Sequence, residues 1–215
     1  MEALMLSALF FAGIFAVTLP DPSDIQTITA GSSAVIDISS GEGWIRLLED
    51  DYVCLNLSVS GGVNLIAYDN SGDILCQSGP GGEMVLSAFS DYWFYILIER
   101  DTDRSDPEVT LSVDIVEPVE LIVCDDVSGR VARNEMADIY TFSPQERGNW
   151  TFRLEGTVRT DLDLDVYGRS MSLWGSSASL EGFETVTVAV LPGEEITAVV
   201  SRYGKSGSGE YYFSV

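Results

Sequence analysis

The sequence contains no histidine, and Lys205 is the single lysine among 11 basic residues that face 34 acidic ones. Histidine is the commonest general base and metal ligand, so its absence excludes Ser-His and Cys-His nucleophile pairs and most transition-metal centres. Carboxylate-only chemistry, such as glycoside hydrolysis, stays open because it needs only two Asp or Glu side chains. The net charge of -23 repels phosphate backbones and anionic lipid, which excludes nucleic acid as a partner.

Cysteine is also scarce, and its number is odd. Cys54, Cys76 and Cys124 allow at most one internal disulfide. Cys54 and Cys76 lie in the same half of the chain on neighbouring predicted strands, so we expect these two to pair. Cys124 would then be free or intermolecular. Buried reduced thiols that pack as small apolar side chains are an equal alternative.

A long uncharged apolar run occurs once, over residues 3–19, and is followed by Pro20-Asp21-Pro22. Its length and position are typical of a secretory export segment. A membrane-spanning helix usually needs about 20 apolar residues, so the run is short for an anchor. We therefore predict a leader over residues 1–19, a secreted or cell-surface location, and no stable membrane span after processing.

Beyond Pro22, short runs of alternating apolar and polar residues are separated by clusters of Gly, Ser, Asp and Asn. The alternation is clear over residues 53–59, 109–113 and 185–190. A period of two is the signature of half-buried strands, and the clusters are typical of turns. The sequence predicts an all-β fold: two tandem antiparallel β-sandwich domains, jelly-roll-like, after the N-terminal hydrophobic segment.

The two halves of the chain resemble each other, which indicates a duplicated module. Three pairs of positions align with only short slips: Tyr68 with Tyr167, Glu83 with Glu184, and Arg100 with Arg202. A proline after Glu117 ends the last predicted strand of the first copy. We predict modules over residues 20–118 and 119–215, with seven to eight strands in each.

The second half carries four elements in order: D-I-Y-T-F at 138–142, D-L-D-L-D-V-Y at 161–167, L-W-G-S at 173–176 followed by Glu184, and Y-Y-F-S-V at 211–215. Together they resemble the bacterial pre-peptidase C-terminal domain over nearly all of 119–215, and residues 63–69 resemble it more loosely. The resemblance implies a secreted jelly-roll-like sandwich, usually an accessory module beside a peptidase and related in fold to collagen-binding modules. No peptidase accompanies it in this sequence.

Asp161, Asp163 and Asp165 alternate along one predicted strand, which places their carboxylates on one face about 6.5 to 7 Å apart in succession. Such a face needs solvent, neighbouring arginines or a cation. Calcium takes six to eight oxygen ligands, so this strand would supply one or two and loops the rest. We name these residues as a candidate calcium site and favour the alternative of a solvated acidic face.

An aromatic run, Tyr92-Trp93-Phe94-Tyr95, is the candidate partner-binding surface, because exposed aromatic rings offer large and rigid contact area to peptides or sugars. In an alternating strand two of the four point inward, and core packing is the alternative that we favour.

Two sequons, Asn56-Leu57-Ser58 and Asn149-Trp150-Thr151, are candidate N-glycosylation sites. They mean something only in a host that has the glycosylation machinery.

These features predict a secreted, non-enzymatic binding or accessory protein that contacts an extracellular protein or polysaccharide. One alternative is a subunit that self-associates into a surface layer or filament through an exposed sheet edge or Cys124. The other is a carboxylate-dependent hydrolase, which a chain of this size without extended loops makes improbable.

Overall fold

The computed structural model describes residues 17–215 apart from 50–52, 61, 80–81, 89–91, 101–105, 125, 158–160, 170–171, 181 and 203–207. Eighteen strands, β1 to β18, make up the regular structure of these residues, with no α-helix among them. None of the described segments forms a helix long and apolar enough to cross a membrane. Most of the predicted leader, residues 1–16, lies outside the described residues.

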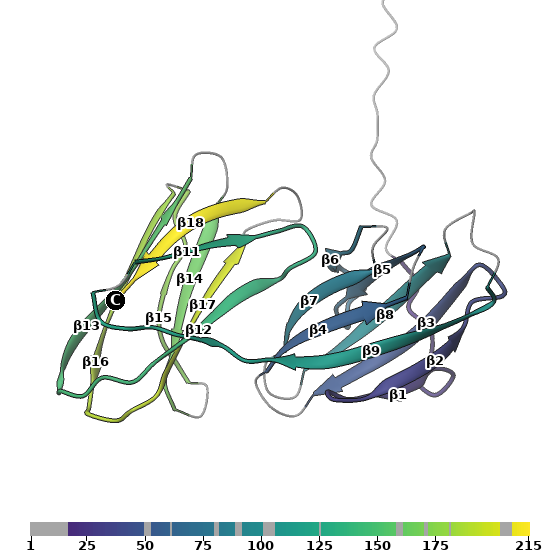
Figure 1. Ribbon diagram of the computed structural model, residues 1–215, viewed down its shortest axis with the longest axis horizontal. Coiled ribbons are helices and arrows are strands. Elements are labelled where there is room, and N and C mark those ends of the chain that lie inside the picture. Colours follow the sequence, from purple (N-terminus) through teal and green to yellow (C-terminus); the bar gives the residue numbers. More distant parts are fainter. Residues whose placement is uncertain are drawn as a thin grey trace, which may run out of the picture.

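The first nine strands form two sheets that face each other (Figure 1). One sheet has the order β1-β3-β8-β5-β6 and the other the order β2-β9-β4-β7. The strands are β1 (Gln26–Ile28), β2 (Ser33–Asp37), β3 (Glu42–Glu49), β4 (Val53–Val59), β5 (Val63–Tyr68), β6 (Ile74–Gln77), β7 (Glu83–Ala88), β8 (Tyr92–Arg100) and β9 (Glu108–Val116).

The last nine strands repeat this arrangement, with sheet orders β10-β12-β17-β14-β15 and β11-β18-β13-β16. They are β10 (Val119–Glu120), β11 (Asp126–Val131), β12 (Ala137–Phe142), β13 (Gly148–Gly156), β14 (Leu162–Tyr167), β15 (Leu173–Ser177), β16 (Phe183–Val190), β17 (Ile196–Arg202) and β18 (Gly209–Ser214). Adding nine to each strand number of the first pair of sheets gives the second pair.

The all-β sandwich class predicted from alternation is confirmed, with two differences of detail. Each pair of sheets has nine strands instead of seven or eight, because β1 and β10 are too short to show a period of two. These two strands also pair in parallel with β3 and β12, whereas the other pairs are antiparallel. Each pair of sheets takes its strands from one side of the predicted boundary at 118, and the predicted module limits themselves stay predictions.

Each pair of sheets encloses its own hydrophobic core. Leu55, Leu57, Ile45 and Phe94 belong to the first core, and Phe152, Leu154 and Phe213 belong to the second. These side chains alternate with outward polar ones along their strands, as in β16, where every second residue is buried. Because both cores are separate and of similar make-up, we refer to the two bodies as the first and second module.

Register shows which aligned positions are equivalent. Arg100 pairs with the first residue of β5, and Arg202 pairs with the first residue of β14, so these arginines occupy the same place. Glu83 and Glu184 do not. Glu184 points inward and is buried, whereas Glu83 is exposed and its neighbour Met84 enters the core. The alignment of these two glutamates is wrong by one residue, and a slip of one residue moves a side chain to the other face of a sheet.

Candidate functional site at the junction of the modules

The turn between β11 and β12 of the second module reaches the edge strand β7 of the first (Figure 1). The Val85 amide donates to the carbonyl oxygen of Asn134 at 2.8 Å, and the Met136 amide donates to the carbonyl oxygen of Val85 at 3.0 Å. Val85 and Glu135 thereby form an isolated parallel bridge. The second module thus adds a short piece of backbone to an open sheet edge of the first, which satisfies edge groups that would otherwise face solvent.

Side chains reinforce this contact. Met136 packs, partly buried, against the hydrophobic core of the first module. The Arg133 guanidinium donates to Gln77 Oε1 at 2.6 Å, and Asn134 Nδ2 donates to the Glu83 carbonyl at 3.3 Å. A contact that combines backbone pairing, an apolar anchor and polar bonds holds the two modules in one relative orientation.

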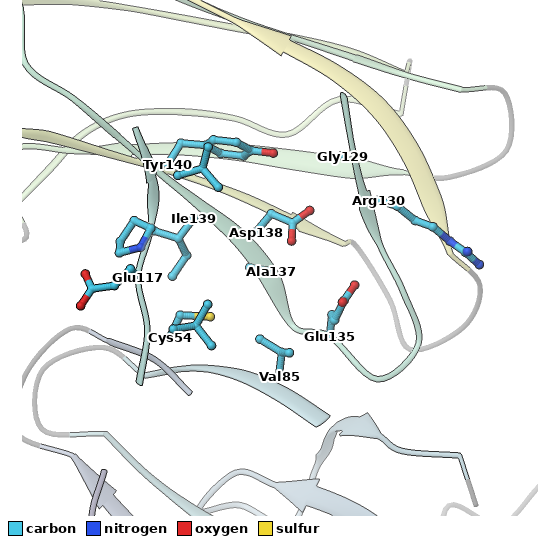
Figure 2. A pocket seen from close by; sticks show the side chains of 13 residues that line it. Cys54, Val85, Glu117, Gly129, Arg130, Glu135, Ala137, Asp138, Ile139 and Tyr140 are labelled. Carbon is cyan, nitrogen blue, oxygen red and sulfur yellow. The ribbon is translucent and has the colours of Figure 1, made fainter. Parts of the chain in front are cut away.

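A groove of about 320 Å³ lies beside this contact, between the modules (Figure 2). Six apolar side chains line it: Val85, Val116, Pro118, Val119, Ala137 and Ile139. Cys54 contributes its thiol from β4, and Asp138 and Tyr140 contribute from β12. Mostly apolar walls with a few converging polar groups are typical of binding pockets.

Asp138 is the centre of a hydrogen-bond network at the groove. Tyr211 Oη donates to Asp138 Oδ2 at 2.5 Å, and Tyr140 and Tyr211 share a hydrogen bond of 2.7 Å between their hydroxyls. Burial raises the pKa of Asp138 to about 6, and the charge of Glu135 adds to the rise. The hydrogen bond from Tyr211 lowers this pKa but does not offset the effect of burial. Burial likewise raises the pKa of Tyr211 and of Tyr140, so both phenols are neutral donors.

Gly129 makes this network sterically feasible. It lies directly across from Tyr211 in the β11/β18 pair, and a Cβ atom built on it would lie 2.3 Å from the phenol oxygen of Tyr211. The tyrosine ring therefore lies over the bare glycine backbone. Any larger residue at 129 would displace the ring from Asp138.

The groove is acidic as well as apolar. In Figure 2 the Glu135 carboxylate points toward Asp138, whereas the Arg130 side chain extends away from both. Arg130 donates to Ser208 instead, at 3.2 Å. The Glu135 carboxylate accepts the Ala132 amide at 2.8 Å, which fixes it within the turn.

The chain that joins the modules carries exposed apolar side chains next to the groove. We call residues 115–123 the apolar linker. Leu121 is buried in the core of the second module and anchors the linker there. Five other side chains of the linker are exposed: Ile115, Val116, Val119, Ile122 and Val123. Val116 and Val119 also line the groove, so the two features are continuous. A run of exposed branched residues on a protein surface indicates an interaction site.

The predicted aromatic surface is mostly interior. Phe94 is fully buried in the first core, and Tyr95 is 5% exposed on the opposite face of its sheet. There Tyr95 packs in a small cluster with Tyr68 that Val17 and Leu19 help to cover. Trp93 is half-buried, and the Arg46 guanidinium lies 4.5 Å from the centre of its ring. The Tyr92 side chain lies outside the described part. Phe94 and Tyr95 are therefore not available as a partner-binding surface, and the favoured alternative of packing holds for both, because packing covers both faces of β8.

Asp163 and Asp165 lie in β14, and Asp161 directly precedes this strand. All three are half-buried and alternate with inward Leu162, Leu164 and Val166. Burial raises the pKa of Asp163, and the charges of Asp161, Asp165 and Glu184 add to the rise. Among the described residues, no three Asp, Glu or Cys side chains are grouped so as to hold one metal ion. Calcium binding at this face stays a prediction that needs ligands from elsewhere.

None of the three cysteines forms a disulfide in the structure, so the expected Cys54–Cys76 disulfide is wrong. Cys54 belongs to β4 and Cys76 to β6, and these strands lie in different sheets. Cys76 points into the first core, whereas Cys54 points out into the groove. Burial raises the pKa of Cys76 to about 12. Both are buried thiols, the alternative given by the sequence, and Cys124 is exposed.

The sequon asparagines lie on outward faces of strands. Asn149 in β13 is exposed, and Asn56 in the middle of β4 is half-buried. Their modification stays a prediction.

Sequence reasoning missed the Asp138-Tyr140-Tyr211 network, although all three residues belong to family-like elements. It also missed a buried carboxylate: Glu184 accepts hydrogen bonds from the hydroxyls of Ser177 and Ser179 and from the Ser179 amide. The alternation of β16 alone signals that Glu184 points inward.

Neither a protein-family model nor a curated protein matches the chain. Among solved structures, the pre-peptidase C-terminal domain of collagenase from Bacillus anthracis has 15% identity and a TM-score of 0.41, and covers 46% of this chain and 93% of its own. The M60 catalytic domain with two CBM51 domains from Clostridium perfringens ZmpB has 7% identity and a TM-score of 0.28, and covers 80% of this chain and 33% of its own. Likenesses this remote carry no argument about function, so the site stands on its geometry.

Proposed function

We propose that this chain is a secreted or cell-surface, non-enzymatic binding protein, and that the groove with the apolar linker receives an extended segment of a partner protein. The observation that carries the proposal is the run of exposed branched side chains that continues into a groove between two coupled modules. Burying such side chains contributes about 25 cal/mol per Å² of apolar area removed from water.

The groove is also built before a partner arrives. Backbone bonds between β7 and the β11–β12 turn fix its walls, so binding does not have to order them. Preorganisation of this kind lowers the entropic cost of association. Asp138 and Glu135 at its acidic end favour a segment that carries a basic residue, which suits a chain with a net charge of -23.

A catalytic role has less support. The Asp138 carboxylate accepts a hydrogen bond from the Tyr211 hydroxyl. The pKa of Tyr211 is raised, so this phenol stays protonated and is a poor general base. Histidine is absent from the chain. The groove therefore offers recognition groups without an activated nucleophile.

The experiment is selection of peptides from a random phage-displayed library on the immobilised protein, followed by affinity measurement with synthetic peptides. Val119→Asp places a charge in the groove, and we expect it to weaken selected peptides at least tenfold. Val35→Asp is the matched control, because Val35 is also an exposed strand valine and lies in β2, outside the lining of the groove. Peptides that bind both variants as tightly as the wild type would contradict the proposal.

Self-association is the second outcome that the same variants detect. If the apolar linker contacts another copy of the chain, sedimentation velocity will show an oligomer that Val119→Asp dissociates. A monomer at high concentration under oxidising conditions would rule out assembly through the linker or through Cys124.

A further inference from the structure

The outer face of the β11-β18-β13-β16 sheet lies on the second module and does not include the groove residues Asp138 and Tyr140. It is hollowed by a shallow depression of about 640 Å³. Phe183 and Tyr212 are both part of it, and they are 54% and 58% exposed. Large aromatic side chains that stay this exposed are unusual on a folded domain.

The register places these two rings in one row across the sheet. Glu155 of β13 pairs with Phe183 on one side and with Tyr212 on the other. Residues directly opposite each other in a sheet point to the same face, so the row reads Phe183, Glu155, Tyr212. Strands are about 4.8 Å apart, which puts the two aromatic positions about 9.6 Å apart with a carboxylate between them. That separation is comparable to two linked sugar rings.

The next row is polar. Arg153 pairs with Thr185 on one side and with Ser214 on the other, and Ser214 pairs with Asp126. All four belong to the same depression. The row offers a guanidinium, a carboxylate and two hydroxyls side by side, which are donors and acceptors suited to the neighbouring hydroxyl groups of a sugar.

We infer that this face binds a neutral, linear polysaccharide whose rings stack on Phe183 and Tyr212 while Glu155 and the Arg153 row hold its hydroxyls. Flat rings with a polar row beside them match a chain that has apolar ring faces and polar edges. Charge selects the neutral class, because a chain with net charge -23 repels polyanions and carries no basic stripe for them here. A flat apolar surface of a partner protein is a less suitable occupant, because the depression contains three charged side chains.

The test is affinity gel electrophoresis and titration calorimetry of the full chain with neutral polysaccharides (xyloglucan, mixed-linkage β-glucan, galactomannan, amylose) and anionic comparators (alginate, polygalacturonate). We expect at least one neutral polysaccharide to bind. Phe183→Ala and Tyr212→Ala should each raise its Kd at least tenfold with an unchanged melting temperature, because both side chains are exposed. Leu180→Ala is the control: Leu180 is 91% exposed and outside the depression.

Three results would overturn the inference: no neutral polysaccharide binds, polyanions bind as well as neutral chains, or both aromatic variants bind as the wild type does. A dimer in sedimentation velocity that Phe183→Ala dissociates would also overturn it, because the face would then be occupied by a second copy. Val119→Asp, which blocks the groove, should leave polysaccharide binding unchanged, so failure at one site is distinguishable from failure at the other.

Discussion

Replacing Asp138 by asparagine should stabilise the protein at neutral pH and leave it unchanged near pH 4. The pKa of the Asp138 carboxyl is raised from 3.8 to about 6, mainly by burial. Between these values the folded state holds a proton that the unfolded state releases, so stability falls as pH rises from about 4 to 6, and the full cost applies above pH 6. This rise in the pKa of Asp138 corresponds to a cost of about 3 kcal/mol in the free energy of unfolding.

Asparagine keeps the shape of the side chain, and its oxygen can still accept the Tyr211 hydroxyl. The variant loses the charge that strengthens this hydrogen bond, and water screens part of the cost of the Asp138 charge in the wild type. We therefore expect the free energy of unfolding to rise by about 1–2 kcal/mol at pH 7.5. For a chain of this length that gain corresponds to a rise of about 2–8 °C in melting temperature. Thermal unfolding followed by circular dichroism at half-unit steps from pH 4 to 8 measures the difference between variant and wild type.

Asp114→Asn is the control for the general relief of charge repulsion, because Asp114 is exposed on β9. The control should shift the melting temperature by less than Asp138→Asn at pH 7.5. If the Asp138→Asn difference does not change with pH, or if the variant is less stable than the wild type at pH 7.5, the description of Asp138 as a half-buried carboxylate with a raised pKa is refuted.

Three further outcomes are expected. Met136→Ser removes the apolar anchor from the first core and should lower the free energy of unfolding by about 1–2 kcal/mol. We expect the single calorimetric unfolding transition of the wild type to split into two. A single transition at the wild-type temperature would contradict this. Thiol titration of unreduced, denatured protein should count three thiols, with Cys124 alone reacting quickly in the native state, whereas a count of one would restore the Cys54–Cys76 disulfide. Millimolar calcium should leave the melting temperature within 1–2 °C of its value in chelator if Asp161, Asp163 and Asp165 are solvated. A larger rise that Asp163→Asn abolishes would establish the calcium site.

The fold was largely predictable from local patterns. Alternation in β4, β9 and β16 reports which side chains enter the core, because a half-buried strand has a period of two. The duplicated halves could be aligned because Arg100 and Arg202 keep the same register position. The two-residue strand β10 could not be found, since pairing with β12 and not pattern makes it a strand.

The site was less predictable, because it depends on contacts between distant parts of the chain. Tyr95 reads as an outward residue of β8, and it is covered by a cluster with Tyr68 against which the distant Leu19 packs. Cys54 and Cys76 are close in sequence but belong to different sheets. The groove needs β7 of one module and the β11–β12 turn of the other, and no local pattern reports that edge pairing.

Amide hydrogen exchange at the module junction tests the account most directly, because a preformed groove requires that the two modules are held together. The Val85 and Met136 amides donate to carbonyl oxygens across the junction and should be protected from exchange in the wild type. Their protection should fall in Met136→Ser while amides within β13 keep theirs. If both amides exchange as quickly as exposed turn residues in the wild type, the modules move independently and the groove is not preformed.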